Sequence, residues 1–267
     1  MTEHSCDLDP DLALALALAD IADAITLDRA GAHDLRAEHK PDRTPVTDAD
    51  IAVEDAVRAM LAVRRPQDSV LGEERGGPGE GDRAARVWVL DPIDGTKNFL
   101  RGLPIWATLI ALVQDGTPVV GVVSAPALRR RWWAAAGLGA QTRDMDGCAR
   151  AITVSGVSEL ADAYVSTTHL GSWVEHHSRE AYLALVDACW ENRAFGDFWQ
   201  HCLVAEGVID LAAEPIVGPW DVAAVQVLVE QAGGRCTDLA GVARYDGGTA
   251  LSSNGLLHEP ALALLRR

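Results

Sequence analysis

Apolar side chains near the start of the chain recur with the spacing of one helical face. The segment alternates Leu and Ala, which taken alone would suit a strand, but its length and Ala content favour a helix. Asp9 and Pro10 provide a cap and a first helical turn. The i, i+4, i+7, i+11 stripe of this helix consists of Leu14, Leu18, Ile21 and Ile25.

A second helical pattern follows the polar stretch at residues 39–45. We expect this helix to begin between Thr47 and Asp50, where residues that favour helix starts gather. Its apolar positions are Ile51, Val53, Val57, Met60 and Leu61.

Short apolar runs bounded by turn residues predict strands in the rest of the first half. They lie at residues 69–71, 87–90, 106–113, 119–125 and 132–135. The run at 87–90 is expected to stop at Asp91 and Pro92, and Asp115-Gly116 supplies the turn between the third and fourth runs.

From about residue 150 the pattern changes to alternating strand and helix. In chain order the predicted elements are strand 164–167, helix 179–190, strand 202–209 and helix 220–232. Gly233-Gly234 closes the last of these helices. We place a boundary near 148–152, which divides the chain into an N-terminal α+β half (1–150) and a C-terminal α/β half (151–267).

The charge of the chain narrows its function class. Among 267 residues, 23 are Lys or Arg and 39 are Asp or Glu, giving a formal net charge of −16, and 48% hydrophobic residues suffice for a sizeable core. A surface this acidic repels phosphate polymers and anionic lipid, so it argues against binding to nucleic acid or a membrane surface. A small anionic substrate stays compatible, because bound cations reverse the field locally.

The five cysteines are scattered, with no C-x-x-C pair, which fits a reducing cytosol better than a disulfide framework. The apolar stretch at 12–19 is too short to span a bilayer. Acidic residues precede it where a secretory signal would carry positive charge. We therefore expect a soluble, cytoplasmic protein.

Three acidic clusters lie where predicted elements begin or end. They are Glu73-Glu74 after a strand, D-P-I-D-G-T at residues 91–96 after a strand, and Trp220-Asp221 at a helix start. Each has an ordinary reading, because paired glutamates in loops are usually solvated and aspartate at a helix start is a routine cap.

The middle cluster carries more chemistry than a turn requires. Asp91 and Asp94 sit three residues apart at the end of an apolar strand, and Pro92 stiffens the turn between them. A helix starting at Gly95 would point free N–H groups at an anion such as phosphate. Hard carboxylate ligands suit Mg²⁺ or Mn²⁺ rather than zinc. Together these features describe a metal-assisted phosphoryl hydrolase.

The ordered string G-E-E at 72–74, W-V-L-D-P-I-D-G-T-K-N-F at 88–99 and P-W-D-V-A-A at 219–224 is far more specific than any one part. On these motifs the chain resembles the inositol monophosphatase family of magnesium-dependent phosphatases, over nearly its whole length. Segments 40–50, 96–99, 124–128, 131–135 and 196–198 are most similar to the actinobacterial histidinol-phosphatase branch. The resemblance implies a layered αβαβα sandwich, a homodimer, and two or three Mg²⁺ ions per site, with Mn²⁺ as a substitute.

The resemblance also implies a role for each matching residue. Asp50 and Thr96 would orient and deprotonate the attacking water, with Glu74 acting behind the metal ligands. Backbone N–H groups of Gly95 and Thr96 would hold the phosphate, beside Asp94. The metal ligands would be Glu73, Asp91, the Ile93 carbonyl, Asp94 and Asp221.

Residues of the second half are expected to select the substrate. Glu214 matches the family position that contacts the alcohol part of the substrate. Asp197 stands where many family members carry a small Ser, and a carboxylate there suits a substrate with an ammonium group. In an alternative reading, Asp197 caps a helix that starts at Phe198. Arg193 is expected near the phosphate or as an ion-pair partner of Asp197.

The first hypothesis is therefore hydrolysis of the small phosphomonoester L-histidinol phosphate, in histidine biosynthesis. An inositol or broad sugar-alcohol monophosphatase would share every metal ligand. A silent metal- or phosphate-binding module is disfavoured, because every residue of the expected set is present. The Gly-rich segment 75–86 fits a lid over the substrate and an exposed connection equally well.

Overall fold

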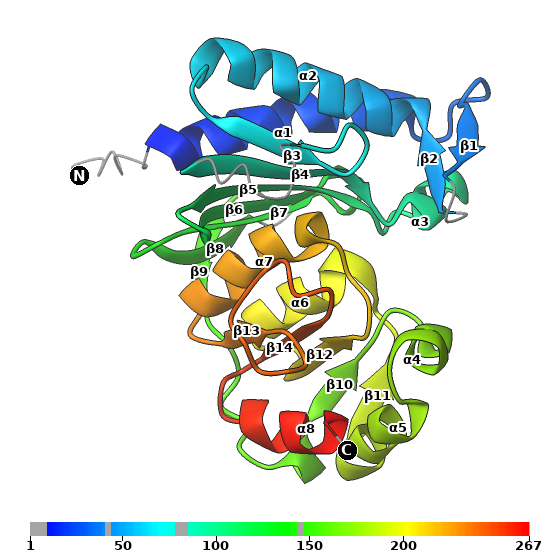
Figure 1. The fold of residues 1–267 in the computed structure, drawn as a ribbon, viewed down its shortest axis with the longest axis vertical. Helices are drawn as coiled ribbons and strands as arrows, with labels where there is room; N and C mark the ends of the chain where they lie inside the picture. The colour runs from blue at the N-terminus through cyan, green and yellow to red at the C-terminus, as the bar shows by residue number, and fades with distance from the viewer. Residues whose placement is uncertain (1–9, 41–43, 78–84, 144–146, 267) are drawn as a thin grey trace.

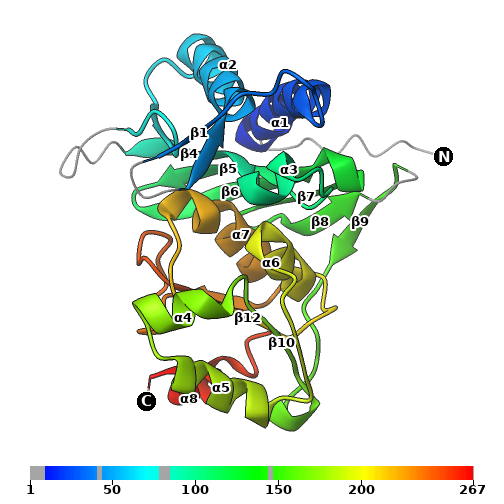
Figure 2. The same cartoon turned by 90° about the vertical axis from the view of Figure 1, so that its right-hand side faces the viewer.

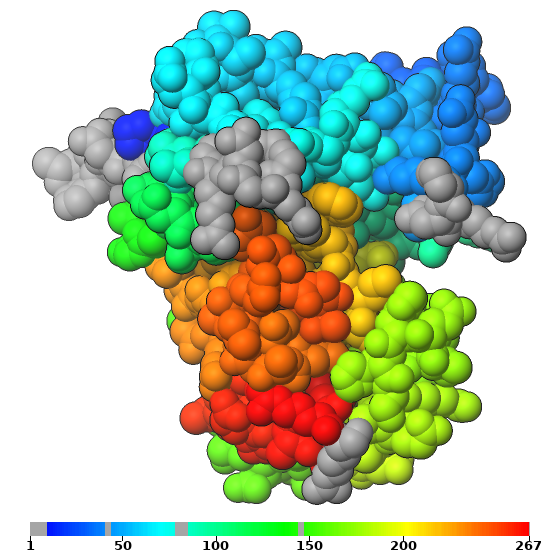
Figure 3. Space-filling model, in the orientation of Figure 1, coloured from blue at the N-terminus to red at the C-terminus, as the bar shows by residue number. Residues whose placement is uncertain are grey.

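The chain forms five layers, in the order helix, sheet, helix, sheet, helix (Figure 1, Figure 2). The computed structural model describes residues 10–40, 44–77, 85–143 and 147–266. In the space-filling view, residues of the first half form the wider upper part and residues of the second half the narrower lower part (Figure 3). The predicted αβαβα sandwich is confirmed.

The first layer contains two helices, both as predicted. They are α1 (Pro10–Arg29) and α2 (Asp48–Arg64). Helix α1 buries Leu14 and Leu18, while Ile21 and Ile25 lie at the edge of its buried face. Thr47 caps α2 in a reciprocal capping box with Asp50. A two-stranded ribbon joins the helices, β1 (Ala37–His39) antiparallel to β2 (Pro45–Thr47).

The second layer is a seven-stranded sheet whose strands follow one another in chain order. The strands are β3 (Ser69–Gly72), β4 (Arg86–Asp94), β5 (Ala107–Gln114), β6 (Thr117–Ala125), β7 (Arg130–Ala135), β8 (Gly139–Arg143) and β9 (Ala149–Ile152). Side chains on β5 alternate between its faces: Leu109 and Ala111 pack towards the middle helices, Ile110 and Leu112 towards α1 and α2. Because both faces are buried, these strands read as continuous apolar runs.

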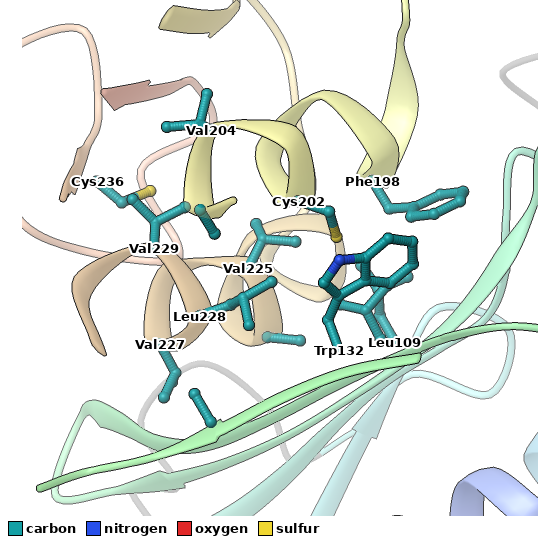
Figure 4. Packing of buried hydrophobic residues seen from close by; sticks show 14 of the residues in the cluster. Leu109, Trp132, Phe198, Cys202, Val204, Val225, Val227, Leu228, Val229 and Cys236 are labelled. Carbon is teal, nitrogen blue, oxygen red and sulfur yellow. The ribbon is translucent and has the colours of Figure 1, made fainter. Parts of the chain in front are cut away.

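The middle layer consists of α6 (Asp197–Ala205) and α7 (Pro219–Gln231). Figure 4 shows Leu109 and Trp132 of the sheet packed beneath Cys202 and Val225 of these helices. The predicted strand at 202–209 is wrong, since its first half lies in α6. The part of the run that lies in α6, residues 202–205, is entirely apolar and buried, and so short a run does not distinguish a buried helix from a buried strand. Gly233-Gly234 closes α7 as predicted, with Gly233 at φ 90°.

The fourth layer is a five-stranded sheet of order β11-β10-β12-β14-β13, and the fifth contains three helices. The strands are β10 (Tyr164–Ser166), β11 (Glu191–Arg193), β12 (Leu211–Glu214), β13 (Arg235–Thr237) and β14 (Ala250–Ser253). The helices are α4 (Leu170–His176), α5 (Arg179–Ala188) and α8 (His258–Leu265). Since α6 and α7 pack on both sheets, the two halves share one core, and their division near residue 150 stays a prediction.

The cysteines and the lengths of the helices bear on the cellular environment expected from the sequence. Each cysteine within the described ranges (Cys148, Cys189, Cys202 and Cys236) is a free thiol. None of the helices in those ranges combines the length and apolar composition needed to cross a bilayer.

Candidate active site

Strand β4 brings the first two carboxylates together. It does not stop at Asp91 as predicted but continues to Asp94, with a register shift between these residues in its pairing with β5. The Thr108 hydroxyl donates to the Pro92 carbonyl oxygen at 2.7 Å and secures the irregular segment. Such a bulge redirects side chains at the end of a strand. Both aspartates consequently line one cleft of about 400 Å³.

The turn after β4 opens the short helix α3 (Thr96–Leu100), one residue after the predicted start. Its N-cap, Gly95, has φ 85°, and a Cβ there would lie 2.9 Å from the Ile105 carbonyl oxygen. Glycine is therefore required by both conformation and space. The Thr96 hydroxyl donates to the Ile93 carbonyl oxygen at 2.9 Å. Gly95, Thr96 and Ile93 all line the cleft, and their contacts with phosphate and metal stay predictions.

Helix α7 contributes the third carboxylate from the other half of the chain. Asp221 is its third residue, and Asp221 Oδ2 accepts from the Gly218 N–H at 2.7 Å. Asp91, Asp94 and Asp221 each offer a carboxylate oxygen within 4.8 Å of the others. The fold therefore brings Asp91 and Asp221 together although they stand 130 positions apart in the sequence.

The three clustered aspartates lie so close together that their negative charges repel one another unless a cation is bound. Burial, followed by the charges of Glu73 and Asp94, raises the pKa of Asp91 well above its usual value. Burial also raises the pKa of Asp221 to about 7. Within the described residues, Asp91 Oδ1 is buried without a hydrogen-bond partner. Clustered hard oxygens with unmet charge fit Mg²⁺ or Mn²⁺, so the donor set suits the expected metal.

Glu73 and Glu74 follow β3 and are not solvated loop residues. Their side chains are 20% and 4% exposed, and Lys40 Nζ lies 2.7 Å from Glu73 Oε1 and 2.8 Å from Glu74 Oε1. Burial raises the pKa of Glu74 to about 7. Lys40 belongs to a segment that carried the family resemblance, but sequence reasoning gave it no role. It holds both glutamates beside the cleft through two ion pairs.

Asp50 lies deeper than the residues that line the cleft. Its Oδ2 accepts from the Thr47 N–H at 2.7 Å and the Thr47 hydroxyl at 2.5 Å, as expected of the third residue in a capping box. Its Oδ1 is buried and has no hydrogen-bond partner among the described residues. Burial raises the pKa of Asp50 to about 6, with the charge of Glu73 adding to the rise. Its role towards water remains a prediction.

Asp197 lines the cleft, but it is not the N-cap of α6. The N-cap of α6 is Gly196, and Asp197 itself has φ 47°. Asp197 Oδ2 accepts from Asn98 Nδ2 at 3.1 Å, and the Asp197 N–H donates to Thr168 Oγ1 at 2.8 Å. Burial raises its pKa, while nearby Lys97 lowers it. The alternative in which Asp197 caps α6 is therefore wrong.

Glu214 lines a smaller recess of about 170 Å³ beside the cleft. Its Oε1 accepts from the Thr168 N–H at 2.7 Å, from the Thr168 hydroxyl at 2.5 Å, and from Gln200 Nε2. Burial raises its pKa to about 7. Thr168 thus connects Glu214 to the first residue of α6. Sequence reasoning missed Thr168, because a threonine in a short Ser-Thr-Thr run after a strand carries no distinguishing pattern.

Arg193 is not brought to the cleft. It lies on β11, its side chain is 54% exposed, and Arg193 Nη1 lies 2.5 Å from Glu191 Oε1. The ion pair predicted with Asp197 is therefore wrong, because the backbone of the strand directs Arg193 to a nearer carboxylate. The proposed lid at 75–86 falls largely on residues 78–84, which lie outside the described residues.

The acidic cluster predicts how stability depends on pH and metal. Asp221 and Glu74 have folded pKa values of about 7, above their unfolded values, so their stabilising effect is present at low pH and is lost as pH rises towards 8. The metal-free protein should melt at a lower temperature at about pH 8 than at about pH 5.5. Added Mg²⁺ should raise the melting temperature more at the higher pH. Thermal melts in EDTA and in Mg²⁺ measure this; an equal effect of Mg²⁺ at both pH values contradicts it.

Several known proteins resemble this chain over nearly its whole length. The profile of the inositol monophosphatase family matches residues 7–266, a range that includes every carboxylate described above. The histidinol-phosphatase of Mycobacterium tuberculosis is 56% identical over 256 residues, covering 96% of this chain and 97% of the relative. That of Streptomyces coelicolor is 49% identical over 261 residues, with 96% and 97% covered. An inositol monophosphatase structure from Zymomonas mobilis matches with a TM-score of 0.82 at 32% identity, covering 96% of this chain and 98% of that one.

Proposed function

Because this chain belongs to the inositol monophosphatase family and is a phosphatase, we propose that it hydrolyses L-histidinol phosphate to L-histidinol and phosphate. The identity of 56% over nearly the full length of a histidinol-phosphatase carries the proposal. Asp197 gives it a physical reason. Burial raises the pKa of the half-buried Asp197 carboxyl, and a substrate that brings an ammonium group would favour its charged form.

The metal ligands in this proposal are two carboxylates of β4, one of α7, one of the turn after β3, and a backbone carbonyl. They are Asp91, Asp94, Asp221, Glu73 and the Ile93 oxygen. When bound there, two or three Mg²⁺ ions, or Mn²⁺ in their place, would offset the phosphate charge and would make a nearby water more acidic. Ile93 retains an acceptor lone pair beyond the one used by Thr96.

The protein's own groups orient the attacking water. Because Thr96 Oγ1 donates its proton to the Ile93 carbonyl, its lone pairs are left to accept a hydrogen bond from that water. We assign the proton of that water to Asp50, whose buried Oδ1 lies behind the cleft wall and whose pKa of about 6 suits an acceptor that works near neutral pH. Glu74 stands behind Glu73 and shares Lys40 with it.

The start of α3 binds the phosphate in this proposal. The first N–H groups of a helix have no partner within it, and here Gly95 and Thr96 bring theirs to the cleft wall. The alcohol part extends towards Asp197 and the recess lined by Glu214. Placement of the enzyme in the cytoplasm, in histidine biosynthesis and as a homodimer belongs to the same proposal.

A side-by-side assay tests the substrate. Phosphate release at saturating Mg²⁺ should show a kcat/KM at least about tenfold higher for L-histidinol phosphate than for myo-inositol monophosphate, since one charged contact gives discrimination of that order. Asp91→Asn controls for contaminating phosphatases. Equal or better turnover of the inositol ester would instead assign a broad sugar-alcohol monophosphatase.

A further inference from the structure

A buried carboxylate on α2 contacts the turn that carries Glu73 without lining the cleft. Glu54 has no exposed surface. Its Oε2 accepts from the Glu74 N–H at 2.9 Å and its Oε1 from the Arg75 N–H at 3.1 Å. One side chain therefore binds two consecutive backbone groups immediately after Glu73.

Arg58, one helical turn later, completes the arrangement. Its Nε donates to Glu54 Oε1 at 2.8 Å, and its Nη2 lies 2.7 Å from the same oxygen. Arg58 also donates to the Val70 carbonyl oxygen at 3.3 Å and to that of Gly76. Glu54 and Arg58 together therefore form hydrogen bonds with the backbone of the turn and with the backbone on both sides of it.

The close approach of Glu54 is built into the sequence at Gly72. A Cβ on Gly72 would overlap the Glu54 carboxylate, although Gly72 has no left-handed conformation that would itself demand glycine. The absence of a side chain at this position therefore serves the contact between Glu54 and the turn.

We infer that Glu54 and Arg58 are positioning residues that hold the 73–75 turn in its metal-binding conformation before metal arrives. The inference rests on the proposed function only in taking Glu73 as a metal ligand. A buried ion pair contributes little to stability compared with apolar side chains of similar size. Here its charges are matched to two backbone N–H groups of the turn and to one carbonyl oxygen on each side of it, which points to the geometry of that turn.

The test measures Mn²⁺ binding to the full-length chain by the electron paramagnetic resonance signal of free Mn²⁺. In Glu54→Gln, an amide replaces one oxygen and sets a donor against a backbone donor. We expect the Kd for Mn²⁺ to rise about 10- to 100-fold, the usual effect of removing a group that orients a ligand. At saturating metal, kcat and KM should return to within about threefold of wild type, because the ligands themselves are intact.

Asp55→Asn is the matched control. Asp55 is the next residue of α2, is 54% exposed, and pairs with the Arg75 side chain of the same turn. The same carboxylate-to-amide change there should alter the Kd for Mn²⁺ by less than about twofold, since exposed pairs contribute little.

Two further variants keep the outcomes separate. If Glu73→Gln weakens Mn²⁺ binding and Glu54→Gln lowers only the melting temperature, the positioning role is overturned and the proposed metal site stands. If Glu73→Gln has no effect, the proposed metal site itself fails. Should Glu54→Gln not fold, Arg58→Lys decides: it keeps the charge beside Glu54 but loses the fork to Val70 and Gly76, and unchanged Mn²⁺ affinity would reject the inference.

Discussion

Asp91→Asn is expected to lower phosphate release by at least about 1,000-fold, equivalent to about 4 kcal/mol of transition-state stabilisation, without unfolding the protein. Asp91 places a carboxylate oxygen within 4.8 Å of those of Asp94 and Asp221. The amide of the substituted asparagine cannot provide the anionic ligand that the metal requires. In the metal-free protein the same change removes a buried carboxyl group whose pKa is raised by burial and by the neighbouring carboxylates, and so relieves an unfavourable cluster. Activity and stability should therefore move in opposite directions.

Two measurements check this pair of effects. Phosphate release at saturating Mg²⁺ should be lost, while the melting temperature in EDTA should stay equal or rise, by about 2–4 °C for each kcal/mol of relieved repulsion. Asp115→Asn, in the exposed turn between β5 and β6, is the control, because asparagine tolerates its φ of 49°. Near-normal turnover by Asp91→Asn would remove Asp91 from the site, and a large fall in melting temperature would make its role structural.

Most of the fold could be predicted, because its elements show clear local patterns. Strand β5 is flanked by turn residues, and α2 begins with a side-chain cap. The failure at 202–209 has a physical cause: α6 is buried between two sheets, and a short apolar run does not distinguish a buried helix from a buried strand. The early end predicted for β4 failed because Thr108, on the next strand, extends the irregular pairing past Pro92.

The candidate site could be predicted only as far as its residues belong to contiguous motifs. Asp91 and Asp94 share one motif, and the family resemblance joined Asp221 to them. The support around them could not be read from the chain, because it depends on distant contacts. The Phe198 N–H donates to Asp94 Oδ2 at 2.5 Å across 104 positions. Arg193 shows the opposite case, because it pairs with Glu191, only two residues away, and not with Asp197 as predicted.

Asp197→Asn should reduce kcat/KM for L-histidinol phosphate by about 10- to 100-fold, which corresponds to about 1.4–2.8 kcal/mol for a charged contact in a largely buried site. The substitution is conservative in every other respect. Asparagine accepts the left-handed backbone at φ 47°, and its amide oxygen can still accept from Asn98 Nδ2. What it removes is the negative charge, so the loss should appear mainly in KM if the ammonium is bound equally in substrate and transition state.

A substrate without the amine separates charge recognition from a general disturbance of α6. The phosphate ester of 3-(imidazol-4-yl)propanol keeps the imidazole and the ester of histidinol phosphate but lacks its ammonium group. Asp197→Asn should change kcat/KM for this analogue by less than about threefold, because the coupling between a side chain and a substrate group disappears when either is removed. Equal losses on both substrates would show that Asp197 acts through Asn98 and the start of α6, where Phe198 contacts Asp94. The preference for an amine-bearing alcohol would then have to arise elsewhere, with Glu214 the next carboxylate along the recess.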